Sequence, residues 1–307
     1  MYTVLIATDK PFAKVAVNGI SEIVKKAGFQ LKLLEKYTAK EQLLEAVKDV
    51  DAIIVRSDII DEQVIQAAGK LKIAVRAGAG YDNIDLKAAS AKGVVVMNTP
   101  GQNANAVAEL GFGMMIYLNR NFYNGSSGVE LRGKTLGIHA YGHIGRIVGM
   151  IAKGLGMDVF AHDPYVDKVV VENDGVKYLA DVGDMYKKCQ YVSVNLPANK
   201  ETKESLNFDL LNLMPEGATL VNTARKEIVH EPSLLKMFAE RKDFRYVTDV
   251  APDCQEQIKA EYAARYYATP KKMGAQTEEA NINAGLAAAR QIVNFLTKGD
   301  KTFQVNG

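Results

Sequence analysis

The sequence predicts an α/β protein made of two doubly wound parallel sheets, and three observations support this fold class. Short runs of β-branched residues alternate with segments of helical periodicity along nearly the whole chain, a pattern typical of parallel sheets covered by helices. The 307 residues exceed the ~100–200 residues of a usual single domain. The first strand series also stops near Pro100-Gly101, a pair that marks a turn, and a second series begins later in the chain.

The first predicted sheet lies in the N-terminal part of the chain and is expected to be flavodoxin-like. Between its first two strands, Ile20, Ile23, Val24 and Ala27 form an apolar stripe of helical period that ends at Gly28, a common helix stop. The five strands predicted for this sheet are Val4–Ala7, Leu31–Leu34, Ala52–Val55, Ile73–Arg76 and Val94–Met97.

The second predicted sheet is expected to form a Rossmann domain. Helical segments flank it at about Asn103–Asn121 and Glu278–Thr297, and the later helix is expected to return to the first domain. We therefore assign residues 1–97 and 282–307 to one domain and residues 98–281 to the other. The strands predicted for the second sheet are Thr135–His139, Asp158–His162, Tyr191–Val194, Thr219–Asn222 and Tyr246–Asp249.

The composition argues against several classes of protein. Lys and Arg number 38 against 36 Asp and Glu and are not clustered, so no nucleic-acid-binding surface is expected. Cys189 and Cys254 form no Cys-x-x-Cys pair and the four histidines lack metal-ligand spacing, so we expect no metal site and a reducing, cytoplasmic location. No apolar run is long enough to span a membrane, and no membrane partner is expected.

A glycine-containing loop follows the strand Thr135–His139. It reads Ala140-Tyr141-Gly142-His143-Ile144-Gly145, a Gly-x-Gly-x-x-Gly pattern whose first glycine is alanine. Gly142 would let the backbone approach a pyrophosphate at the helix N-terminus, and Gly145 would let the helix pack on the strand. Asp163 follows the glycine-containing loop by about 20 residues, the usual spacing of the acid that binds the ribose hydroxyls. Its negative charge would repel a 2′-phosphate. The pattern predicts NAD rather than NADP binding, with close helix packing as the alternative explanation of the glycines.

Charged residues near the ends of the second series of strands are candidates for chemistry, because open parallel sheets bind ligands at the carboxyl ends of their strands. Arg225 follows the strand Thr219–Asn222, and its guanidinium could bind a carboxylate through two parallel hydrogen bonds. Asp249 could hold the amide of a nicotinamide. The alternatives are a surface arginine and an aspartate that only turns the chain.

Four stretches of the sequence resemble the D-isomer-specific 2-hydroxyacid dehydrogenases. They are Val75–Asp85, Asn98–Leu110, Asn222–Arg225 and Gly274–Ala280. The resemblance implies NAD-dependent hydride transfer from a small 2-hydroxy acid, and it is greatest to short members that act on a phosphorylated acid. It implies a homodimer whose contact face is the helix at 103–121. It further implies a catalytic Arg225, a phosphate site at Arg56 and Ser57, substrate-binding amides at Gly78 and Ala79, and cofactor contacts at Leu196, Pro197, Thr223, Ala224 and Gly274.

The sequence departs from the family at its acid–base pair. The family has a histidine directly after Thr-Pro and a glutamate that orients it, whereas this chain has Lys271 and Cys254 there. To accept a proton, Lys271 must first lose one, which burial or a nearby Arg225 would favour. Loss of the carboxylate fits this exchange, because an adjacent negative charge would keep a lysine protonated. Glu256 lies two residues beyond the missing glutamate, and a shift of the loop could bring it into that position.

Two alternative functions remain open at this point. The substrate could be an unphosphorylated acid such as glycerate, hydroxypyruvate, glyoxylate or lactate, and Arg56 is the residue that discriminates between these readings. The family also includes nucleotide-sensing corepressors, in which NAD controls assembly. Arg225 together with a candidate proton acceptor favours an enzyme.

Overall fold

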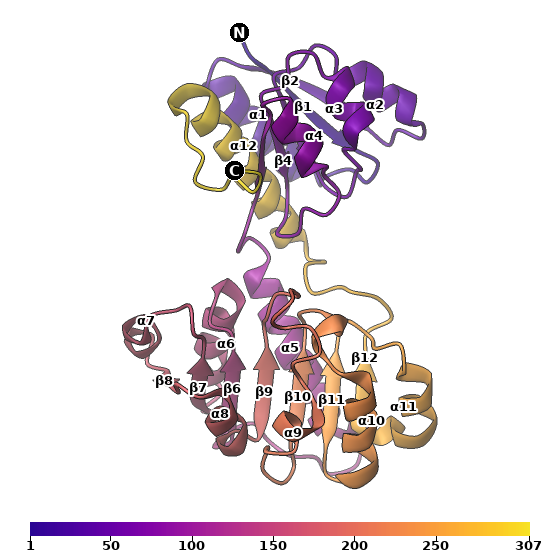
Figure 1. Ribbon diagram of the computed structural model, residues 1–307, viewed down its shortest axis with the longest axis vertical. Helices are drawn as coiled ribbons and strands as arrows, with labels where there is room; N and C mark the ends of the chain where they lie inside the picture. Colours follow the sequence, from indigo (N-terminus) through magenta and orange to yellow (C-terminus); the bar gives the residue numbers. More distant parts are fainter. The chain divides into compact units, whose positions relative to one another are not determined.

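The computed structural model describes residues 1–307 and divides into two compact units, Met1–Asn103 with Ala275–Gly307, and Ala104–Gly274 (Figure 1). Each unit contains one parallel sheet with interleaved helices, which confirms the predicted fold class. The predicted division had placed 98–103 and 275–281 in the other unit.

Unit 1 contains a five-stranded sheet with the order β2-β1-β3-β4-β5, the order of flavodoxin-like folds. Its strands are β1 (Thr3–Thr8), β2 (Gln30–Glu35), β3 (Ala52–Val55), β4 (Ile73–Arg76) and β5 (Val95–Asn98). Its helices are α1 (Lys14–Lys26), α2 (Lys40–Ala46), α3 (Glu62–Ala67), α4 (Leu86–Ala91) and α12 (Glu278–Lys298). The predicted last strand of this sheet was one residue too early.

Helix α12 belongs to unit 1 although it is the last helix of the chain. The Thr277 side chain caps its N-terminus by accepting from the Ala280 amide, and Gly299 ends it in a left-handed conformation. The helix packs closely on α1, since a Cβ on Gly19 would come within 2.6 Å of Leu286. This packing ties the C-terminal segment to the N-terminal sheet.

Unit 2 contains a seven-stranded sheet with the order β12-β11-β10-β9-β6-β7-β8, which is the Rossmann order with one added strand. Its strands are β6 (Thr135–His139), β7 (Asp158–His162), β8 (Lys177–Tyr178), β9 (Tyr191–Val194), β10 (Thr219–Asn222), β11 (Arg245–Thr248) and β12 (Tyr266–Ala268). Its helices are α5 (Ala104–Asn119), α6 (His143–Gly154), α7 (Lys168–Asn173), α8 (Val182–Lys188), α9 (Phe208–Leu211), α10 (Glu231–Glu240) and α11 (Gln255–Tyr262). Asp249 follows β11 rather than ending it, so the predicted strand was displaced by one residue.

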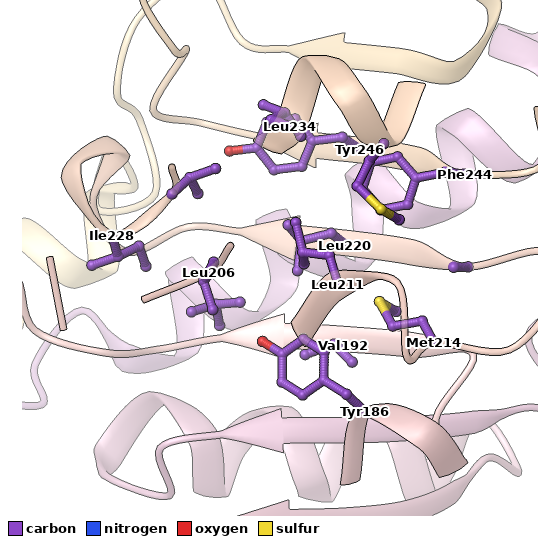
Figure 2. Close-up of a cluster of buried hydrophobic side chains, with 14 of the residues drawn as sticks. Tyr186, Val192, Leu206, Leu211, Met214, Leu220, Ile228, Leu234, Phe244 and Tyr246 are labelled. Carbon is purple, nitrogen blue, oxygen red and sulfur yellow. The ribbon is translucent and has the colours of Figure 1, made fainter. Parts of the chain in front are cut away.

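The core of unit 2 lies on both faces of its sheet. Figure 2 shows one half of it, where Val192 of β9, Leu220 of β10 and Tyr246 of β11 meet side chains from the covering helices. Tyr186 and Leu234 of these helices are completely buried. Strands buried on both sides explain why the sequence shows continuous apolar runs instead of alternation.

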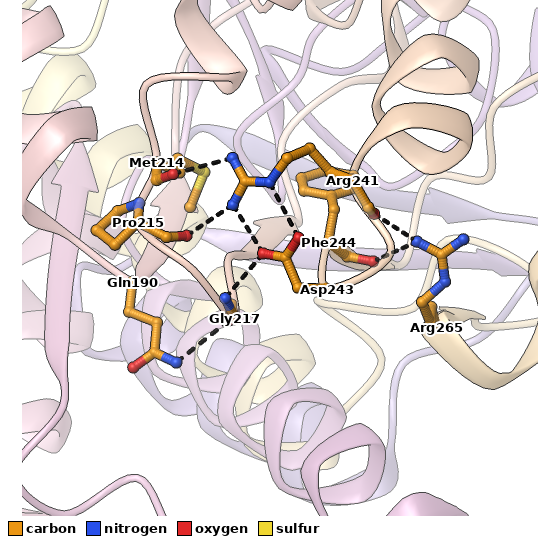
Figure 3. Close-up of polar contacts among 8 residues, drawn as sticks. All are labelled: Gln190, Met214, Pro215, Gly217, Arg241, Asp243, Phe244 and Arg265. Atoms are coloured by element: carbon orange, nitrogen blue, oxygen red, sulfur yellow. Dashed lines mark hydrogen bonds and ion pairs between the residues drawn. The ribbon is translucent and has the colours of Figure 1, made fainter.

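A polar cluster joins the loops before β10 and β11 (Figure 3). The Arg241 guanidinium binds the Asp243 carboxylate at 2.7 and 3.0 Å, and the Gly217 amide donates to the same carboxylate at 2.8 Å. These contacts hold the pKa of Asp243 well below its usual range. The cluster fixes the loops where β10 and β11 begin, at the end of the sheet opposite the candidate site.

None of the helices combines the length and the apolarity needed to cross a bilayer.

Candidate active site

The loop between β6 and α6 presents free backbone amides. Helix α6 begins at His143 with Gly142 as its N-cap, and no side chain caps it. A Cβ on Gly142 would meet open space, whereas one on Gly145 would lie 2.4 Å from the Ala140 carbonyl oxygen. Gly145 therefore packs the helix on the strand as predicted, and the exposed N-terminus of α6 is open to an anion.

Ala140 adopts a left-handed backbone with φ of 77°. An L-residue in that region is strained by about 1–2 kcal/mol, which the usual glycine avoids. The turn nevertheless closes, because the Ala140 amide donates to the His162 carbonyl at 2.9 Å. Alanine thus preserves the shape of the loop at some cost in stability.

Asp163 lies directly after β7 and beside this loop. Its carboxylate, 7% exposed, accepts the Tyr141 amide at 2.7 Å and the Tyr165 amide at 2.9 Å. Each oxygen keeps a second lone pair for a hydroxyl donor. The Tyr165 hydroxyl donates to Glu201 at 3.0 Å, which places a second carboxylate near this part of the loop. The arrangement suits two ribose hydroxyls and opposes an added phosphate.

Asp249 is the second buried acid of unit 2. It is 1% exposed, and its Oδ2 accepts the Gly274 amide at 2.7 Å and the Met273 amide at 3.2 Å. Its Oδ1 is buried without any hydrogen-bond partner. Burial raises the pKa of this carboxyl, while the Gly274 amide and the nearby Lys272 lower it. A buried acceptor without a donor is costly unless a ligand supplies one, and a carboxamide NH₂ would do so. The residues present therefore fit a nicotinamide dinucleotide.

Arg225 and Lys272 meet at a single backbone oxygen. The Ala224 carbonyl accepts Arg225 Nη1 at 2.9 Å and Lys272 Nζ at 3.1 Å. Ala224 itself is held by Asn222, whose Oδ1 accepts the Ala224 amide at 3.0 Å. Two cations are thus placed together at the carboxyl end of β10, near Asp249. Such a pair can bind an anion and stabilise negative charge on an oxygen.

The predicted acid–base residues lie in the loop after β12 and in α11. Lys271 is exposed, and only its backbone carbonyl makes a contact, with the Thr269 hydroxyl at 2.7 Å. Its neighbour Lys272 is exposed as well but donates to the Ala224 carbonyl, the oxygen that also accepts Arg225 Nη1. Glu256 is exposed and pairs with Lys259 of its own helix at 3.0 Å.

Cys254 stands where the family has a carboxylate. Its amide donates to Glu231 at 2.9 Å, and burial and this carboxylate raise the pKa of its thiol to about 12. The thiol is therefore uncharged at neutral pH. It adds no negative charge that would hold a neighbouring lysine protonated.

The remaining predicted cofactor residues of unit 2 lie after successive strands. Leu196 and Pro197 follow β9, and Thr223 follows β10, where it is 7% exposed. The sequence reasoning missed Asn195, which also follows β9. The Asn195 backbone amide donates to the His139 carbonyl at 2.9 Å, while the buried side-chain Oδ1 has no partner. The sequence does not show that this oxygen, at the carboxyl end of β9, is buried without a donor.

The predicted substrate residues lie together in unit 1, at the carboxyl ends of β3 and β4. Arg56 donates through Nη1 to the carbonyls of Lys10 and Pro11 and through Nη2 to Asn281 Oδ1 at 2.8 Å. Ser57, next in the chain, is exposed. Asn281 comes from α12, so the last helix helps to fix this guanidinium.

Gly78 and Ala79 follow β4 in the same region. The Gly78 amide donates to the Arg76 carbonyl at 2.9 Å, so in this structure it does not point to a substrate as expected. The Ala79 carbonyl accepts Asn98 Nδ2 at 2.6 Å, and the Ala79 amide has no partner within the protein, so of the two amides it is the available donor. Arg76, which the sequence reasoning did not select, lies over Gly78.

Comparisons with known proteins agree with this geometry. The family model described as D-isomer specific 2-hydroxyacid dehydrogenase, catalytic domain, matches residues 10–306. The chain belongs to this family. Among its relatives, a D-3-phosphoglycerate dehydrogenase of Methanocaldococcus jannaschii is 34% identical over 271 residues, which cover 84% of this chain and 52% of the relative. A hydroxypyruvate reductase of Thermotoga maritima is 31% identical over 285 residues, covering 87% of this chain and 92% of the relative.

A solved structure gives a further match. The crystal structure of NAD+-bound 3-phosphoglycerate dehydrogenase of Entamoeba histolytica is 47% identical, covers 100% of this chain and 99% of its own, and superposes with a TM-score of 0.85. The chain spans about half the length of the curated phosphoglycerate dehydrogenases that it matches first.

Proposed function

We propose that this protein oxidises D-3-phosphoglycerate to 3-phosphohydroxypyruvate with NAD as cofactor, the first step of phosphorylated serine biosynthesis. The observation that carries the proposal is the Arg225–Lys272 pair on the Ala224 carbonyl, beside the unpaired Asp249 Oδ1. Such an oxidation requires a group that binds the substrate carboxylate, a positive charge that stabilises the developing carbonyl oxygen, and a group that accepts the hydroxyl proton. The similarity to relatives with this name supports the substrate.

The cofactor would be held by residues of unit 2. The N-terminus of α6 at Gly142 and His143 would bind the pyrophosphate, Asp163 the ribose hydroxyls and Asp249 the carboxamide. Asp163 and Glu201 together favour NAD over NADP, since both carboxylates would repel a 2′-phosphate. When bound, NAD supplies the acceptor for the hydrogen that leaves C2 of the substrate.

Arg225 would bind the substrate carboxylate through its remaining guanidinium N–H groups. The same cation would stabilise the carbonyl oxygen that develops at C2, because preplaced positive charge needs no reorganisation during the reaction. Lys272 would take the hydroxyl proton, which requires the neutral amine before each turnover. Arg225 at the same carbonyl favours the neutral form of the lysine, whereas the nearby Asp249 carboxylate favours the charged form.

The test of this function is a panel of D-2-hydroxy acids. The purified protein is incubated with NAD and D-3-phosphoglycerate, D-glycerate or D-lactate, and NADH formation is followed. We expect a clear preference for the phosphorylated acid, and Arg56→Ala should remove that preference. Equal rates on phosphorylated and unphosphorylated acids would reject the proposed substrate.

Hydroxypyruvate reduction is the second candidate. The Thermotoga maritima relative matches this chain over 92% of its length, whereas the phosphoglycerate dehydrogenases that match first are about twice as long as the match. Under this alternative, D-glycerate would be the best substrate of that panel, hydroxypyruvate would be reduced rapidly with NADH, and Arg56→Ala would affect all substrates alike.

We also propose that the protein acts as a homodimer through α5 and the segment after it. Tyr123 and Val129 in that segment are 63% and 46% exposed. Tyr117, Phe122 and Tyr267 form an aromatic cluster with Tyr123, which gives the face a fixed shape. The mass in solution, measured by light scattering, tests this, and a monomeric mass would reject it.

A reducing, cytoplasmic location is proposed from the two thiols. Cys189 and Cys254 are both free, and Cys189 is buried.

A further inference from the structure

The side chain of Asn222 holds the turn that carries Arg225. Asn222 is the last residue of β10 and is completely buried. Its Oδ1 accepts the Ala224 amide at 3.0 Å, and its Nδ2 donates to the Arg225 carbonyl at 3.0 Å. One carboxamide therefore binds an N–H group and a carbonyl of the same turn, and only one orientation of the carboxamide satisfies both.

These two contacts determine where the Ala224 carbonyl points. The Ala224 amide belongs to the peptide unit before that carbonyl, and the Arg225 carbonyl belongs to the peptide unit after it. Because peptide units are planar, a unit whose two neighbours are held has little freedom to rotate. The oxygen of the unit between them is the one that accepts Arg225 Nη1 and Lys272 Nζ at 2.9 and 3.1 Å. Asn222 therefore acts on both cations through this peptide unit.

The backbone of Asn222 reaches the neighbouring strand. Its carbonyl accepts the Thr248 hydroxyl at 2.7 Å and the Asp249 amide at 3.3 Å. Thr248 ends β11 and is completely buried, and its hydroxyl also accepts the Val250 amide at 2.9 Å. The side chain of Asn222 thus holds the turn with Arg225, whereas its backbone holds the turn with Asp249. A change of the side chain leaves the second set of contacts in place.

Tyr246 of β11 fixes the Asn222 side chain. Tyr246 is completely buried, and its hydroxyl accepts from Asn222 Nδ2 at 3.2 Å. Both hydrogens of this NH₂ group are thereby used, so a rotation of the side chain would leave a buried donor unpaired, which is costly. An asparagine that only ended the strand would need a single contact, from Oδ1 to the Ala224 amide.

We propose that Asn222 is a positioning residue of the active site, which holds Arg225 and the Ala224 carbonyl in the arrangement that binds the substrate carboxylate and stabilises the developing carbonyl oxygen. This inference rests on the proposed function, because it names a residue that acts through Arg225. Asn222 itself is buried and makes no contact with the substrate. A displacement of about 1 Å at a catalytic group can lower the rate by about 10²-fold, so loss of this side chain should be visible in the kinetics.

The experiment compares Asn222→Ala with the wild-type protein on the acid that the wild type oxidises fastest. We expect KM for the acid to rise and kcat to fall, so that kcat/KM drops roughly 10–100-fold. The Kd for NADH should be unchanged, because the contacts to Thr248 and Asp249 come from the backbone carbonyl of residue 222. Asn222→Ser keeps an oxygen that can accept the Ala224 amide and should recover part of the loss.

Asn207→Ala is the matched control. Asn207 also accepts a backbone amide, that of Leu210 at 3.0 Å, but it caps α9 and is exposed. This variant should keep KM, kcat and the Kd for NADH of the wild type. Tyr246→Phe is the test variant if Asn222→Ala does not fold, as judged by its melting temperature. It removes only the hydroxyl and should lower kcat/KM roughly 2–10-fold, again without a change in the Kd for NADH.

A second readout does not depend on turnover. Oxalate, whose carboxylate resembles that of a 2-hydroxy acid, should bind the NADH-loaded wild-type protein in calorimetric titrations, and Asn222→Ala should weaken this binding roughly 10-fold. Unchanged constants in a folded Asn222→Ala variant, a fall in kcat alone, or equal losses of oxalate and NADH affinity would each overturn the role of Asn222. If the wild type oxidises D-3-phosphoglycerate and Asn222→Ala does so equally well, the proposed function stands and this inference fails. If the wild type oxidises none of the acids, the proposed function fails, and the oxalate and NADH titrations decide the role of Asn222.

Discussion

Arg225 and Lys272 donate to the same acceptor, the carbonyl oxygen of Ala224, at 2.9 and 3.1 Å. A carbonyl has two lone pairs, so it can accept from both cations at once. Ala224 follows the buried strand β10 by two residues, so its carbonyl oxygen brings the guanidinium and the ammonium together at the end of that strand, near Asp249. This contact distinguishes Lys272 from its neighbour Lys271.

The first prediction separates the two lysines. Lys272→Met should lower kcat by about 10²–10⁴-fold, the usual contribution of a general base, and should leave the affinity for NAD unchanged. Lys271→Met is the matched control and should retain near-normal turnover, because the bond to the Ala224 carbonyl comes from Lys272. Steady-state rates and NAD titrations measure both. Collapse of turnover in Lys271→Met alone would return the role to Lys271.

Asp249 provides the second prediction. Asp249→Asn retains an oxygen for the Gly274 and Met273 amides but places an NH₂ where Oδ1 now lacks a donor. A donor would then face a donor of the carboxamide, so we expect the Kd for NAD to rise roughly 10–100-fold, as for a lost bond to a charged group. Fluorescence titration with NADH checks this. An unchanged Kd in a folded variant would remove Asp249 from the cofactor site.

The third prediction concerns the strained turn at Ala140. Ala140→Gly should raise the free energy of unfolding by about 0.5–1 kcal/mol, since relief of the left-handed strain exceeds the added flexibility of the unfolded chain. Ala260→Gly, on the exposed side of α11, is the control and should lower it by about 1 kcal/mol. Urea denaturation of both variants measures the difference. A loss of stability in Ala140→Gly would show that the turn is not strained.

The fourth prediction is the pH dependence of the Arg241–Asp243 pair. The pKa of Asp243 is lowered in the folded protein, so its contribution to stability is present above the ordinary aspartate pKa of about 4 and is lost as pH falls below it. Asp243→Asn should therefore destabilise the protein by about 1–3 kcal/mol at neutral pH. Below about pH 3 the difference from wild type should shrink. A difference independent of pH would contradict this account.

The predicted strands agree well with the observed ones because the two sheets are parallel and covered on both faces. Strands of this kind appear as continuous apolar runs, as at Ile73–Arg76 and Thr219–Asn222, where the predicted bounds match. The edge strand β8 was missed, since it has two residues and only β7 as a neighbour. A strand that pairs on one side and is short leaves little hydrophobic signal in the sequence.

The sequence by itself determined the fold class, the family, the nucleotide loop and the importance of Arg225, because these depend on local patterns of glycine, β-branched residues and strand ends. Only the tertiary structure showed that the Ala224 carbonyl accepts from Lys272. Adjacent residues in an irregular loop can make different contacts, and no periodic pattern in the sequence shows the difference. Which ammonium reaches the Ala224 carbonyl, which comes 48 positions earlier in the chain, depends on how β10, β11 and the Thr269–Gly274 loop pack together.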